Sequence, residues 1–457
     1  MSTDETKRPE EVPTEATPTG ETDPLGWVER CVWTERMVEA LRQGGPEGGR
    51  WYSLHDKVFQ AETLRVAYGQ VSRKKAPGVD GVTVEAFGER LDKEIVHLME
   101  EWKEGRYRPQ AIKRVYIPKP GSNEKRPLGI PTVRDRVVQA ALRMVIEPIF
   151  EQDFNGHSFG FRPGRGAHDA MTEVMTHLKE GRVFVVDADL KSYFDSIPHG
   201  PLLKKVHRRV TDGRILCLIE QFLKAGIMEN HEEHEPEAGT PQGGVISPLL
   251  ANIYLNDLDH QLEQSGRAMV RYADDFVILC RSQEEAGQAL EDVRKWTVEA
   301  GLVLHPTKTR IVDMGQPGNH FDFLGFRLEH RDGEKPGDPP RYLRLLRPKS
   351  EDKIKEGIRR LTRRANGRSL EDTIQGLNRV TRGWFGYFRS VHQNLHKKLD
   401  KMIRRRLRAI LAKRQGGTPS GRGSCHSTWP NAFFAGRGLF SLEESHVQFF
   451  HSWRGNR

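Results

Sequence analysis

Two adjacent carboxylates, Asp274 and Asp275, stand between two runs of apolar residues of the kind that form strands. Residues 268–271 precede the segment 272–275 that contains the pair, and residues 276–280 follow it, a pattern that predicts a hairpin with both acids at its turn. Carboxylates held this close together repel one another and favour a divalent cation. Because hard oxygen ligands suit Mg²⁺, the hairpin predicts part of a magnesium site.

A second strand that ends in carboxylates lies upstream. Residues 182–190 read Arg-Val-Phe-Val-Val-Asp-Ala-Asp-Leu, a buried-type strand that carries Asp187 and Asp189 on the same face. Phosphoryl transfer by two metal ions roughly 4 Å apart needs bridging acids from different elements. One ion activates the attacking hydroxyl and the other holds the leaving group. The two strands together therefore predict two-metal phosphoryl transfer.

The stretch between the two acid strands carries a resemblance to a known family. Residues 239–255 read Gly-Thr-Pro-Gln-Gly-Gly-Val-Ile-Ser-Pro-Leu-Leu-Ala-Asn-Ile-Tyr-Leu. With the acids on either side, this block resembles the reverse transcriptases encoded by bacterial group II introns, the intron-encoded maturases. The resemblance spans roughly residues 50 to 414. Further motifs that follow the family's order are Ile117–Pro120, Lys125–Pro131, Ser158–Arg165, Gly301–Thr309 and Phe321–Phe326.

The resemblance implies an α+β fold of the right-hand polymerase type. Fingers and palm with an antiparallel sheet would be followed by an α-helical thumb, also called the maturase domain. The longest members of the family add a DNA-binding segment and an endonuclease with paired cysteines and histidines. We expect this chain to resemble the compact, endonuclease-lacking members, because few residues follow residue 414 and the chain has four cysteines.

The resemblance also assigns a catalytic set, a set of metal ligands and a cofactor. The catalytic residues would be Asp189, Asp274, Asp275 and Lys308. The metal ligands would be Asp189, Leu190, Asp274 and Asp275. The cofactor would be two Mg²⁺ ions, with Mn²⁺ as a substitute. Lys308 occupies the position where polymerases keep a general acid for the pyrophosphate leaving group, although a plain salt bridge would look identical. The family's spacing to Phe194 selects Asp189 rather than Asp187 as the ligand.

A third set of residues would bind the substrates. The expected nucleotide-binding residues are Lys119, Arg126, Phe194, Gln242 and Gly243. Lys119 and Arg126 would clamp the triphosphate from a strand–turn–strand, unless they are only the charges of a surface hairpin. Phe194 would pack under the deoxyribose and exclude a ribose hydroxyl, unless it is merely a core aromatic. Leu324 and Gly325 would grip the primer end.

Positive charge is concentrated in one region. The net charge of the chain is +9, whereas residues 341–414 alone carry 23 Lys and Arg against 6 Asp and Glu. This density favours binding to a phosphate backbone over the usual interpretation of a basic run, which is a solvated helix face. The expected RNA-binding residues are Arg359, Arg360, Arg363, Arg364, Lys397, Lys398, Arg404, Arg405 and Arg408.

The basic region also has the sequence pattern of helices. Ser369 and Asp372 form a capping box, and apolar residues recur at helical spacing in 374–384 and again in 395–410. Three amphipathic basic helices after a palm resemble the thumb of the family, and residues 382–388 match its signature there. We expect the aromatic residues of that signature to be core residues.

The chain divides into five expected segments. Residues 1–24 are acidic and rich in Thr, Glu and Pro, which predicts disorder, and a Gly/Pro stretch at 332–340 precedes the basic region. The expected boundaries are 1–24 for the disordered tail, 25–105 for an N-terminal helical extension and the start of the fingers, 106–340 for fingers and palm, 341–414 for the thumb or maturase domain, and 415–457 for a linker and short tail.

Several classes of protein are excluded by composition. No apolar run approaches the length of a membrane span, and the acidic N-terminus is unlike a secretory signal. The four cysteines include no Cys-x-x-Cys pair, which argues against a zinc module or a disulfide framework. His231 and His234 lie three residues apart in a polar loop, so we expect no metal site there. We therefore expect a cytoplasmic bacterial protein with no membrane partner.

These observations predict an RNA-directed DNA polymerase, a nucleotidyltransferase. Its partners would be an RNA template, its own intron RNA, a DNA primer or target DNA, and deoxynucleoside triphosphates, while a homodimer is left open. The resemblance implies a second role in splicing the intron and in its retrohoming. One alternative is a reverse transcriptase of the same family co-opted for host defence or repair. Another is an RNA-binding maturase without polymerase activity, against which the intact acids argue.

Overall fold

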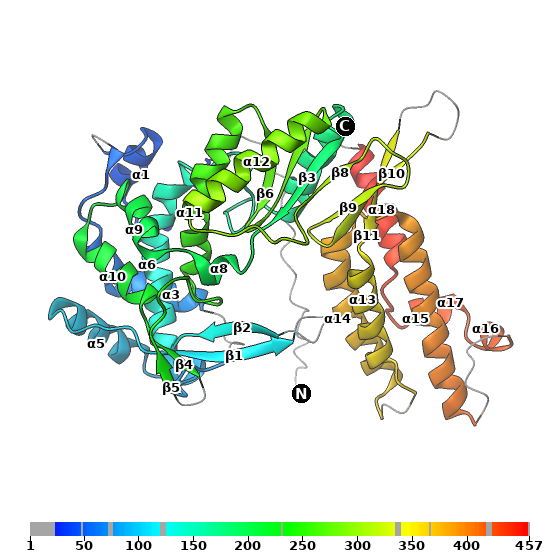
Figure 1. Ribbon diagram of the computed structural model, residues 1–457. Coiled ribbons are helices and arrows are strands. Elements are labelled where there is room, and N and C mark those ends of the chain that lie inside the picture. The colour runs from blue at the N-terminus through cyan, green and yellow to red at the C-terminus, as the bar shows by residue number, and fades with distance from the viewer. Residues whose placement is uncertain are drawn as a thin grey trace, which may run out of the picture.

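The computed structural model describes residues 23–46, 49–71, 76–118, 125–229, 232–333, 340–364, 367–416 and 423–455. Expectations for most of residues 1–24 and 332–340, for part of 415–427, and for Lys119 and His231 therefore fall outside the described residues. Along the chain, mixed helices and strands up to β11 (Arg341–Leu346) are followed by a helical region. Figure 1 shows the two regions side by side, which confirms an α+β fold with a helical C-terminal part.

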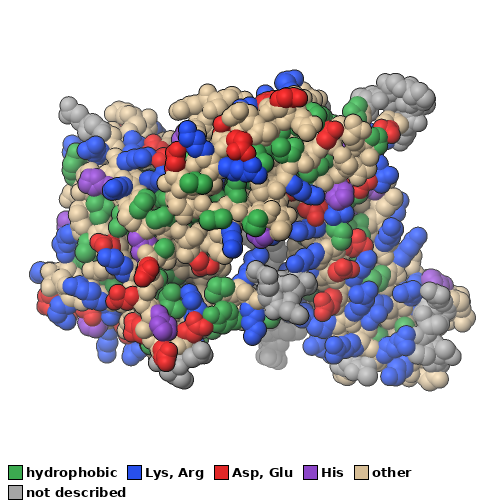
Figure 2. Space-filling model, in the orientation of Figure 1, with side chains coloured by type: hydrophobic (Ala, Val, Ile, Leu, Met, Phe, Trp, Pro, Cys, Tyr) green, Lys and Arg blue, Asp and Glu red, His purple; other side chains and the backbone are tan. Residues whose placement is uncertain are grey.

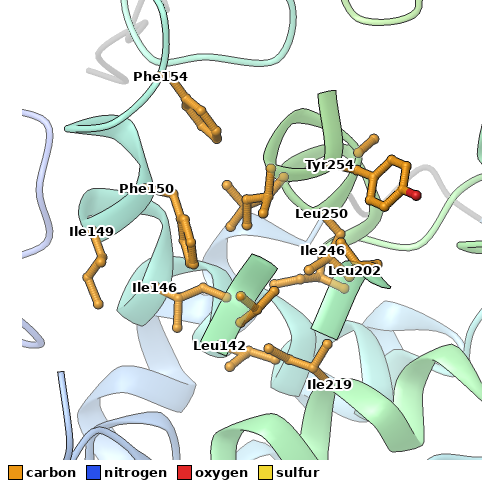
Figure 3. Packing of buried hydrophobic residues seen from close by; sticks show 14 of the residues in the cluster. Leu142, Ile146, Ile149, Phe150, Phe154, Leu202, Ile219, Ile246, Leu250 and Tyr254 are labelled. Carbon is orange, nitrogen blue, oxygen red and sulfur yellow. The ribbon is translucent and has the colours of Figure 1, made fainter. Parts of the chain in front are cut away.

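The N-terminal region is built on one buried helix, α6 (Val133–Glu151), which begins at Thr132. The Thr132 Oγ1 accepts a hydrogen bond from the Asp135 nitrogen at 3.2 Å and so caps the helix. Figure 3 shows the apolar side chains of this helix packed against residues of helices that come later in the chain. The elements around it are α1 (Glu35–Arg42), α2 (His55–Val58), α3 (Ala61–Gln70), α4 (Val84–Gly88), α5 (Leu91–Lys103), β1 (Ile112–Pro118) and β2 (Lys125–Ile130).

Within the described residues, the strands pair into three sheets. The central sheet has the order β6-β7-β3-β8 and is antiparallel throughout. A second antiparallel sheet has the order β11-β10-β9. The third, β2-β1-β4-β5, contains a parallel pair between β1 and β4. The expectation that the sheet of the fingers and palm is antiparallel was therefore wrong for this pair. The strands are β3 (Phe184–Asp189), β4 (Ile227–Glu229), β5 (Glu232–His234), β6 (Ala268–Tyr272), β7 (Asp275–Cys280), β8 (Arg310–Asp313), β9 (His320–Phe323) and β10 (Phe326–Arg331).

The central sheet separates two hydrophobic cores. On β3, Val186 and Ala188 belong to the core beneath α11 and α12, whereas Val185 belongs to the core on the opposite face. Alternate residues of a strand point to opposite faces, so Asp187 and Asp189 share the face of Val185. The remaining helices of this region are α7 (Ala167–Lys179), α8 (Tyr193–Ser196), α9 (His199–His207), α10 (Gly213–Leu223), α11 (Ser247–Gln264) and α12 (Gln283–Glu299).

The helical region begins with the three expected amphipathic helices. Ser369 caps the second of them by accepting a hydrogen bond from the Asp372 nitrogen at 2.9 Å, as the sequence predicts. Three of the four signature aromatics pack partly buried against the core, but Tyr387 is 39% exposed and so departs from the expectation. The helices are α13 (Pro348–Leu361), α14 (Leu370–Phe388), α15 (Gln393–Arg414), α16 (Cys425–Thr428), α17 (Asn431–Ala435) and α18 (Leu442–Gly455).

Among the residues that the structure describes, none of the helices combines the length and the apolar character that crossing a bilayer requires.

A buried carboxyl on α6 gives a pH-dependent contribution to stability. Burial raises the pKa of Glu147 from 4.5 to about 7, with Glu151 raising it and Arg143 lowering it. The folded state then binds the proton more tightly than the unfolded state. This contribution is complete below about pH 4.5 and is lost as the pH rises towards 7. We expect Glu147→Gln to remove this pH-dependent decline in the free energy of unfolding, which amounts to up to ~3 kcal/mol.

The measurement is the melting temperature of both proteins from pH 5 to pH 8. The melting temperature of the variant should rise relative to that of the natural protein as the pH rises. A constant difference in melting temperature across this range would contradict the assignment of the titration to Glu147.

Candidate active site and nucleic-acid interface

The two acids of the hairpin lie where the sequence predicts. Strands β6 and β7 pair antiparallel with Tyr272 opposite Asp275, which leaves Ala273 and Asp274 as a two-residue turn. Ala273 has a φ of 60°, the left-handed conformation that such tight turns require. The turn therefore places Asp274 at its tip and Asp275 at the first position of β7.

The second acid strand lies directly beside the first. In the register of β3 on β7, Asp189 is paired with Asp275 and Asp187 with Val277. Carboxylates that are far apart in the chain thus meet at one end of the central sheet. Asp187 lies deeper along β3, and its Oδ2 is 3.5 Å from the Nε of Arg310 on β8. This arrangement brings Asp189, Asp274 and Asp275 together and gives Asp187 its own cation.

The electrostatics of this cluster favour an added cation. Burial, together with the charges of Asp187, Asp274 and Asp189, raises the pKa of Asp275 to about 8, against a lowering by Arg347. Burial also raises the pKa of Asp274; Asp189 adds to that, while Arg126 and Lys308 oppose it. The ionised forms are therefore poorly compensated by the protein's own charges.

The carboxylates of the cluster are suited to a hard divalent cation that has further ligands of its own. Within the described ranges, no group of three or more His, Cys, Asp or Glu side chains is arranged to hold a metal by itself. Mg²⁺ usually binds one or two carboxylates and completes its shell with water and substrate phosphates. Asp189 and Asp274, as hard oxygen donors from two different elements, fit that requirement.

Lys308 supplies the nearest positive charge to the cluster. Its ammonium forms an ion pair with the Asp189 carboxylate, although the lysine side chain is 60% exposed. The main-chain oxygen of Asp189 accepts a hydrogen bond from the His305 nitrogen at 2.7 Å, which ties the 301–309 motif to the end of β3. The structure therefore contains the salt bridge that the sequence left as an alternative for Lys308.

A buried arginine holds the hairpin turn from behind. Arg271, fully buried on β6, forms an ion pair with Asp259 of α11, to whose Oδ1 its Nε donates at 2.7 Å. Its Nη1 donates to the Asn252 Oδ1 and to the Ala273 main-chain oxygen, each at 2.9 Å. Sequence reasoning missed this residue, although a charged residue inside an apolar strand is itself a signal that a buried partner exists.

The motif at 158–165 forms the other support of the turn. The Phe159 nitrogen donates to the Arg271 main-chain oxygen at 2.9 Å, so the motif runs beside β6. A Cβ built on Gly160 would lie 2.9 Å from the Tyr272 carbonyl carbon and closer still to the Ala273 nitrogen. Only glycine fits at this position. Arg162 fixes the segment by donating to the Glu151 carboxylate and to the Ser158 oxygen at 2.7 Å.

Residues expected to bind the nucleotide lie in one neighbourhood. The Gln242 Nε2 donates to Asp195 at 2.9 Å, and the Gln242 main-chain oxygen accepts from the Gly129 nitrogen of β2 at 2.6 Å. Gly243 has a φ of 112° and lies so close to the Gly129 oxygen that a Cβ would clash. Phe194 is half-buried on α8, and its main-chain oxygen accepts from Thr240 at 2.6 Å. Lys119 lies outside the described residues.

Arg126 reaches the same neighbourhood from β2. The arginine is exposed on the strand, yet its charge is one of the two that oppose the raised pKa of Asp274. Positive charge on β2 therefore acts on the acids at the end of the central sheet.

Leu324 and Gly325 form the tight turn between β9 and β10. Both have a positive φ, 50° and 82°. The Leu324 main-chain oxygen accepts a hydrogen bond from the Tyr387 hydroxyl at 3.1 Å, and the Gly325 oxygen accepts from the Arg347 nitrogen at 3.1 Å. Because Arg347 and Tyr387 both interact electrostatically with Asp275, this turn lies on the acid side of the central sheet.

The basic residues of the helical region do not all reach solvent. Arg359 and Arg360 are exposed at the end of α13, Arg363 and Arg364 are exposed just after it, and Lys398 and Arg405 are exposed on α15. Figure 2 shows Lys and Arg side chains gathered over these helices. Lys397 lies 3.7 Å from Glu443, and Arg404 lies 3.7 Å from Asp400. The residues expected to bind RNA thus divide into exposed cations and cations paired with acids.

Arg408 corrects the sequence expectation for this surface. It is 3% exposed, and its guanidinium donates to the Trp429 main-chain oxygen and to the Asn431 Oδ1, each at 2.8 Å. A buried guanidinium with these partners joins α15 to the segment that follows it. We therefore leave Arg408 out of the proposed RNA surface.

Comparison with known proteins identifies the class. The family model "Reverse transcriptase (RNA-dependent DNA polymerase)" matches residues 117–328, and "Group II intron, maturase-specific domain" matches residues 352–426. Protein YkfC of Escherichia coli K12 is 39% identical over 311 residues, covering 59% of this chain and 79% of YkfC. This chain belongs to the family of group II intron reverse transcriptases and maturases.

The chain is accordingly an RNA-dependent DNA polymerase that carries a maturase domain. Both domains imply binding to nucleic acid, and reverse transcriptases generally use a divalent metal. Group II intron-encoded protein LtrA of Lactococcus lactis is 39% identical over 209 residues, which span 45% of this chain but 34% of LtrA. Among solved structures, a partial Cas6-RT-Cas1–Cas2 complex aligns with a TM-score of 0.36 and 26% identity, over 54% of this chain and 41% of that chain.

The contact between Gly160 and the turn yields a prediction. Gly160→Ala places a methyl group against the Tyr272–Ala273 backbone and shifts the turn that carries Asp274. A displacement of about 1 Å at a catalytic group can reduce the rate on the order of 100-fold. We expect that reduction in primer extension, with RNA affinity retained.

Gly156→Ala is the matched control, because a Cβ there meets no atom within 4 Å. Equal activity of the two alanine variants would show that the turn does not depend on the space at Gly160.

Proposed function

We propose that this chain extends the 3′-hydroxyl of a DNA or RNA primer along an RNA template, using deoxynucleoside triphosphates. The observation that supports this most strongly is the pairing of Asp189 on β3 with Asp275 on β7, next to Asp274 on the turn. Two-metal nucleotidyl transfer needs carboxylates from separate elements at one place. The central sheet supplies that arrangement.

The proposed architecture is a right hand. The palm would contain the central sheet, the fingers the β1–β2 hairpin, and the thumb the helices α13 to α15, within the boundaries 25–105, 106–340 and 341–414. Figure 1 shows the hairpin and the helices on opposite sides beneath the central sheet, and Figure 2 shows the surface hollowed between them. A template–primer duplex would occupy that hollow.

The carboxylates would hold the metals. Two Mg²⁺ ions, or Mn²⁺ in their place, would bind Asp189, Asp274, Asp275 and the main-chain oxygen of Leu190, whose apolar side chain is buried. When bound, they lower the pKa of the attacking hydroxyl and stabilise the leaving pyrophosphate. Lys308 lies beside Asp189 and would donate a proton to the pyrophosphate after reorienting.

The placement of the other motifs supports the proposed substrate contacts. Gln242 and Gly243, held against β2, would form the floor of the nucleotide site, and Phe194 would lie under the sugar. Arg126, with Lys119, would neutralise the triphosphate. The turn at Leu324 and Gly325 would hold the primer end next to the acids.

Intron RNA is the proposed second ligand. The maturase-specific domain and the match to an intron-encoded protein support binding of the chain's own intron RNA, for splicing and retrohoming. A role in host defence or repair would use the same polymerase site. The presence of intron RNA domains in the DNA that flanks the gene distinguishes these two roles.

The first prediction concerns the acids. Asp274→Asn should abolish primer extension in Mg²⁺, because the metals lose a ligand, while RNA affinity should change by no more than a few-fold. Extension of an annealed primer and equilibrium RNA binding measure the two effects. Asp292→Asn, a carboxylate on α12 paired with Arg267 at 3.5 Å, is the control. Normal extension by the Asp274 variant would refute the proposed palm site.

A second prediction concerns the basic surface. Burial lowers the pKa of Arg406, and the positive charges of Arg359, Arg364 and Arg405 lower it too. These arginines therefore form one cluster. Their joint replacement by Gln should weaken RNA binding and lower the slope of log affinity against log salt by about 0.7 to 0.9 for each phosphate that the protein no longer neutralises. Saturating template should restore most of the extension rate, because these residues are remote from the acids.

Arg408→Gln is the control that distinguishes loss of a charge that contacts RNA from loss of a structural contact. Since Arg408 is buried and bonded to Trp429 and Asn431, this variant should lower the melting temperature and leave the salt slope unchanged. An unaltered affinity and slope in the triple variant would show that the cluster does not contact RNA.

A further inference from the structure

A cavity of about 880 Å³ opens where α7, β11, the junction of α14 and α15, and α18 meet. None of the residues proposed above for catalysis, nucleotide binding or the basic surface lines it. Helix α18 lies beyond residue 426, where the maturase match ends. Asp400 of α15 anchors that helix by accepting hydrogen bonds from the nitrogens of Leu442 and Glu443 at 3.1 and 3.2 Å.

The lining of the cavity is cationic. None of the described residues that line it is Asp or Glu, and four are histidines, contributed by α7, the start of α15 and α18. Burial lowers the pKa of His168 and of His446, so these two rings favour the neutral form. Among the described lining residues, those with permanent charge are Lys179, Arg344 and Arg389.

Two of these cations have no acidic partner among the described residues. Arg344 is partly buried, and burial alone lowers its pKa. Its Nη2 lies 3.5 Å from the Met171 oxygen, a weak contact. The Arg389 guanidinium lies 4.9 Å from the centre of the Phe449 ring. Neither arginine forms an ion pair with a carboxylate in the part of the chain that the structure describes. Taking a charge out of water without a counter-charge is costly, so the site is suited to an anion from outside the chain.

Aromatic rings stand next to the cations. Phe449 and Phe450 lie with ring centres 5.3 Å apart and nearly perpendicular, and Phe450 also lies 4.6 Å from the His446 ring. Tyr342 of β11 completes the aromatic part of the lining. Grooves that bind single-stranded nucleic acid combine cations along the backbone with rings on which bases stack. An acidic peptide would use the cations and leave the rings without a role.

The cavity adjoins the turn proposed to hold the primer. The His168 ring lies 6.0 Å from the ring of Tyr387, and the Tyr387 hydroxyl donates to the Leu324 oxygen at 3.1 Å. A strand that leaves the region of that turn can therefore enter the cavity past Tyr387 and His168.

We propose that this cavity binds a single-stranded segment of nucleic acid, with phosphates at Lys179, Arg344 and Arg389 and a base stacked on Phe449. The inference extends the proposed function, because a polymerase with a bound template–primer brings such strands to this side of the protein. It assigns a role to α18, which neither family model includes.

Crosslinking locates the strand directly. The full chain is irradiated with an RNA oligonucleotide containing 4-thiouridine or with a DNA oligonucleotide containing 4-thiothymidine, and the crosslinked peptides are identified by mass spectrometry. We expect peptides from α7 and α18 with at least one of the two probes, and the probe that crosslinks identifies the strand as RNA or DNA. Absence of both peptides with both probes would overturn the proposal.

Matched variants test the cations. Lys179→Gln with Arg389→Gln should reduce those crosslinks and lower the salt slope for single-stranded oligonucleotides by about 0.7 per phosphate contact. Extension of a primer–template with a short template overhang, at saturating concentration, should stay unchanged. The control is Lys224→Gln with Arg294→Gln, two exposed cations that pair with Glu220 and Glu291 on their own helices. An equal effect in both double variants would also overturn the proposal.

The two proposals fail differently. If Asp274→Asn abolishes extension while the α7 and α18 crosslinks are absent, the polymerase site stands and the cavity proposal falls. If the crosslinks are present and Asp274→Asn extends normally, the cavity proposal stands and the palm assignment falls. Competition by polyglutamate without any crosslink to the oligonucleotides would assign the cavity to an acidic peptide instead.

Discussion

The buried ion pair between Arg271 and Asp259 is the interaction on which the site depends. It joins the strand that leads into the acid turn to α11, and the same guanidinium binds the Ala273 oxygen within that turn. Both side chains are fully excluded from solvent. Breaking such a pair leaves an uncompensated buried charge, which costs roughly 3–5 kcal/mol. The geometry of the turn is therefore coupled to the integrity of the core.

The same arginine couples three motifs that are distant in the chain. Its main chain pairs with the segment at 157–159, and its side chain reaches Asn252 of the block at 239–255. Gly160 then lies against the turn with no room for a side chain. The motifs are thus parts of one support for Asp274, which explains why residues remote from any substrate belong to the pattern.

The central sheet determines on which of its two faces the acids lie. Because alternate residues face opposite cores, Asp187 and Asp189 point to the side on which β9 to β11 and the C-terminal helices pack. Burial and mutual repulsion raise the pKa of Asp275, so the cluster carries electrostatic free energy that a divalent cation can recover. The basic helices and the cationic cavity lie on that same side, where the substrate's phosphates would be.

Short-range patterns were sufficient to predict the two strands that carry the acids, the hairpin and the cap of α14, whereas the antiparallel central sheet followed from the resemblance to the family. Alternation in strands, helical periodicity and a side chain that reaches three residues ahead can all be read along the chain. The excess of positive charge in residues 341–414 could be located in the same way, because composition is independent of folding.

Packing between distant segments decided which of those cations reach solvent. Arg405 and Arg408 lie three residues apart on one helix, yet the first is exposed and the second is buried against a segment that follows more than twenty residues later. Likewise, the parallel pairing of β1 with β4, the role of Arg271 and the contact at Gly160 each join residues that are far apart in the chain. Local patterns carry no information about such contacts, since burial and partners depend on how the whole chain packs.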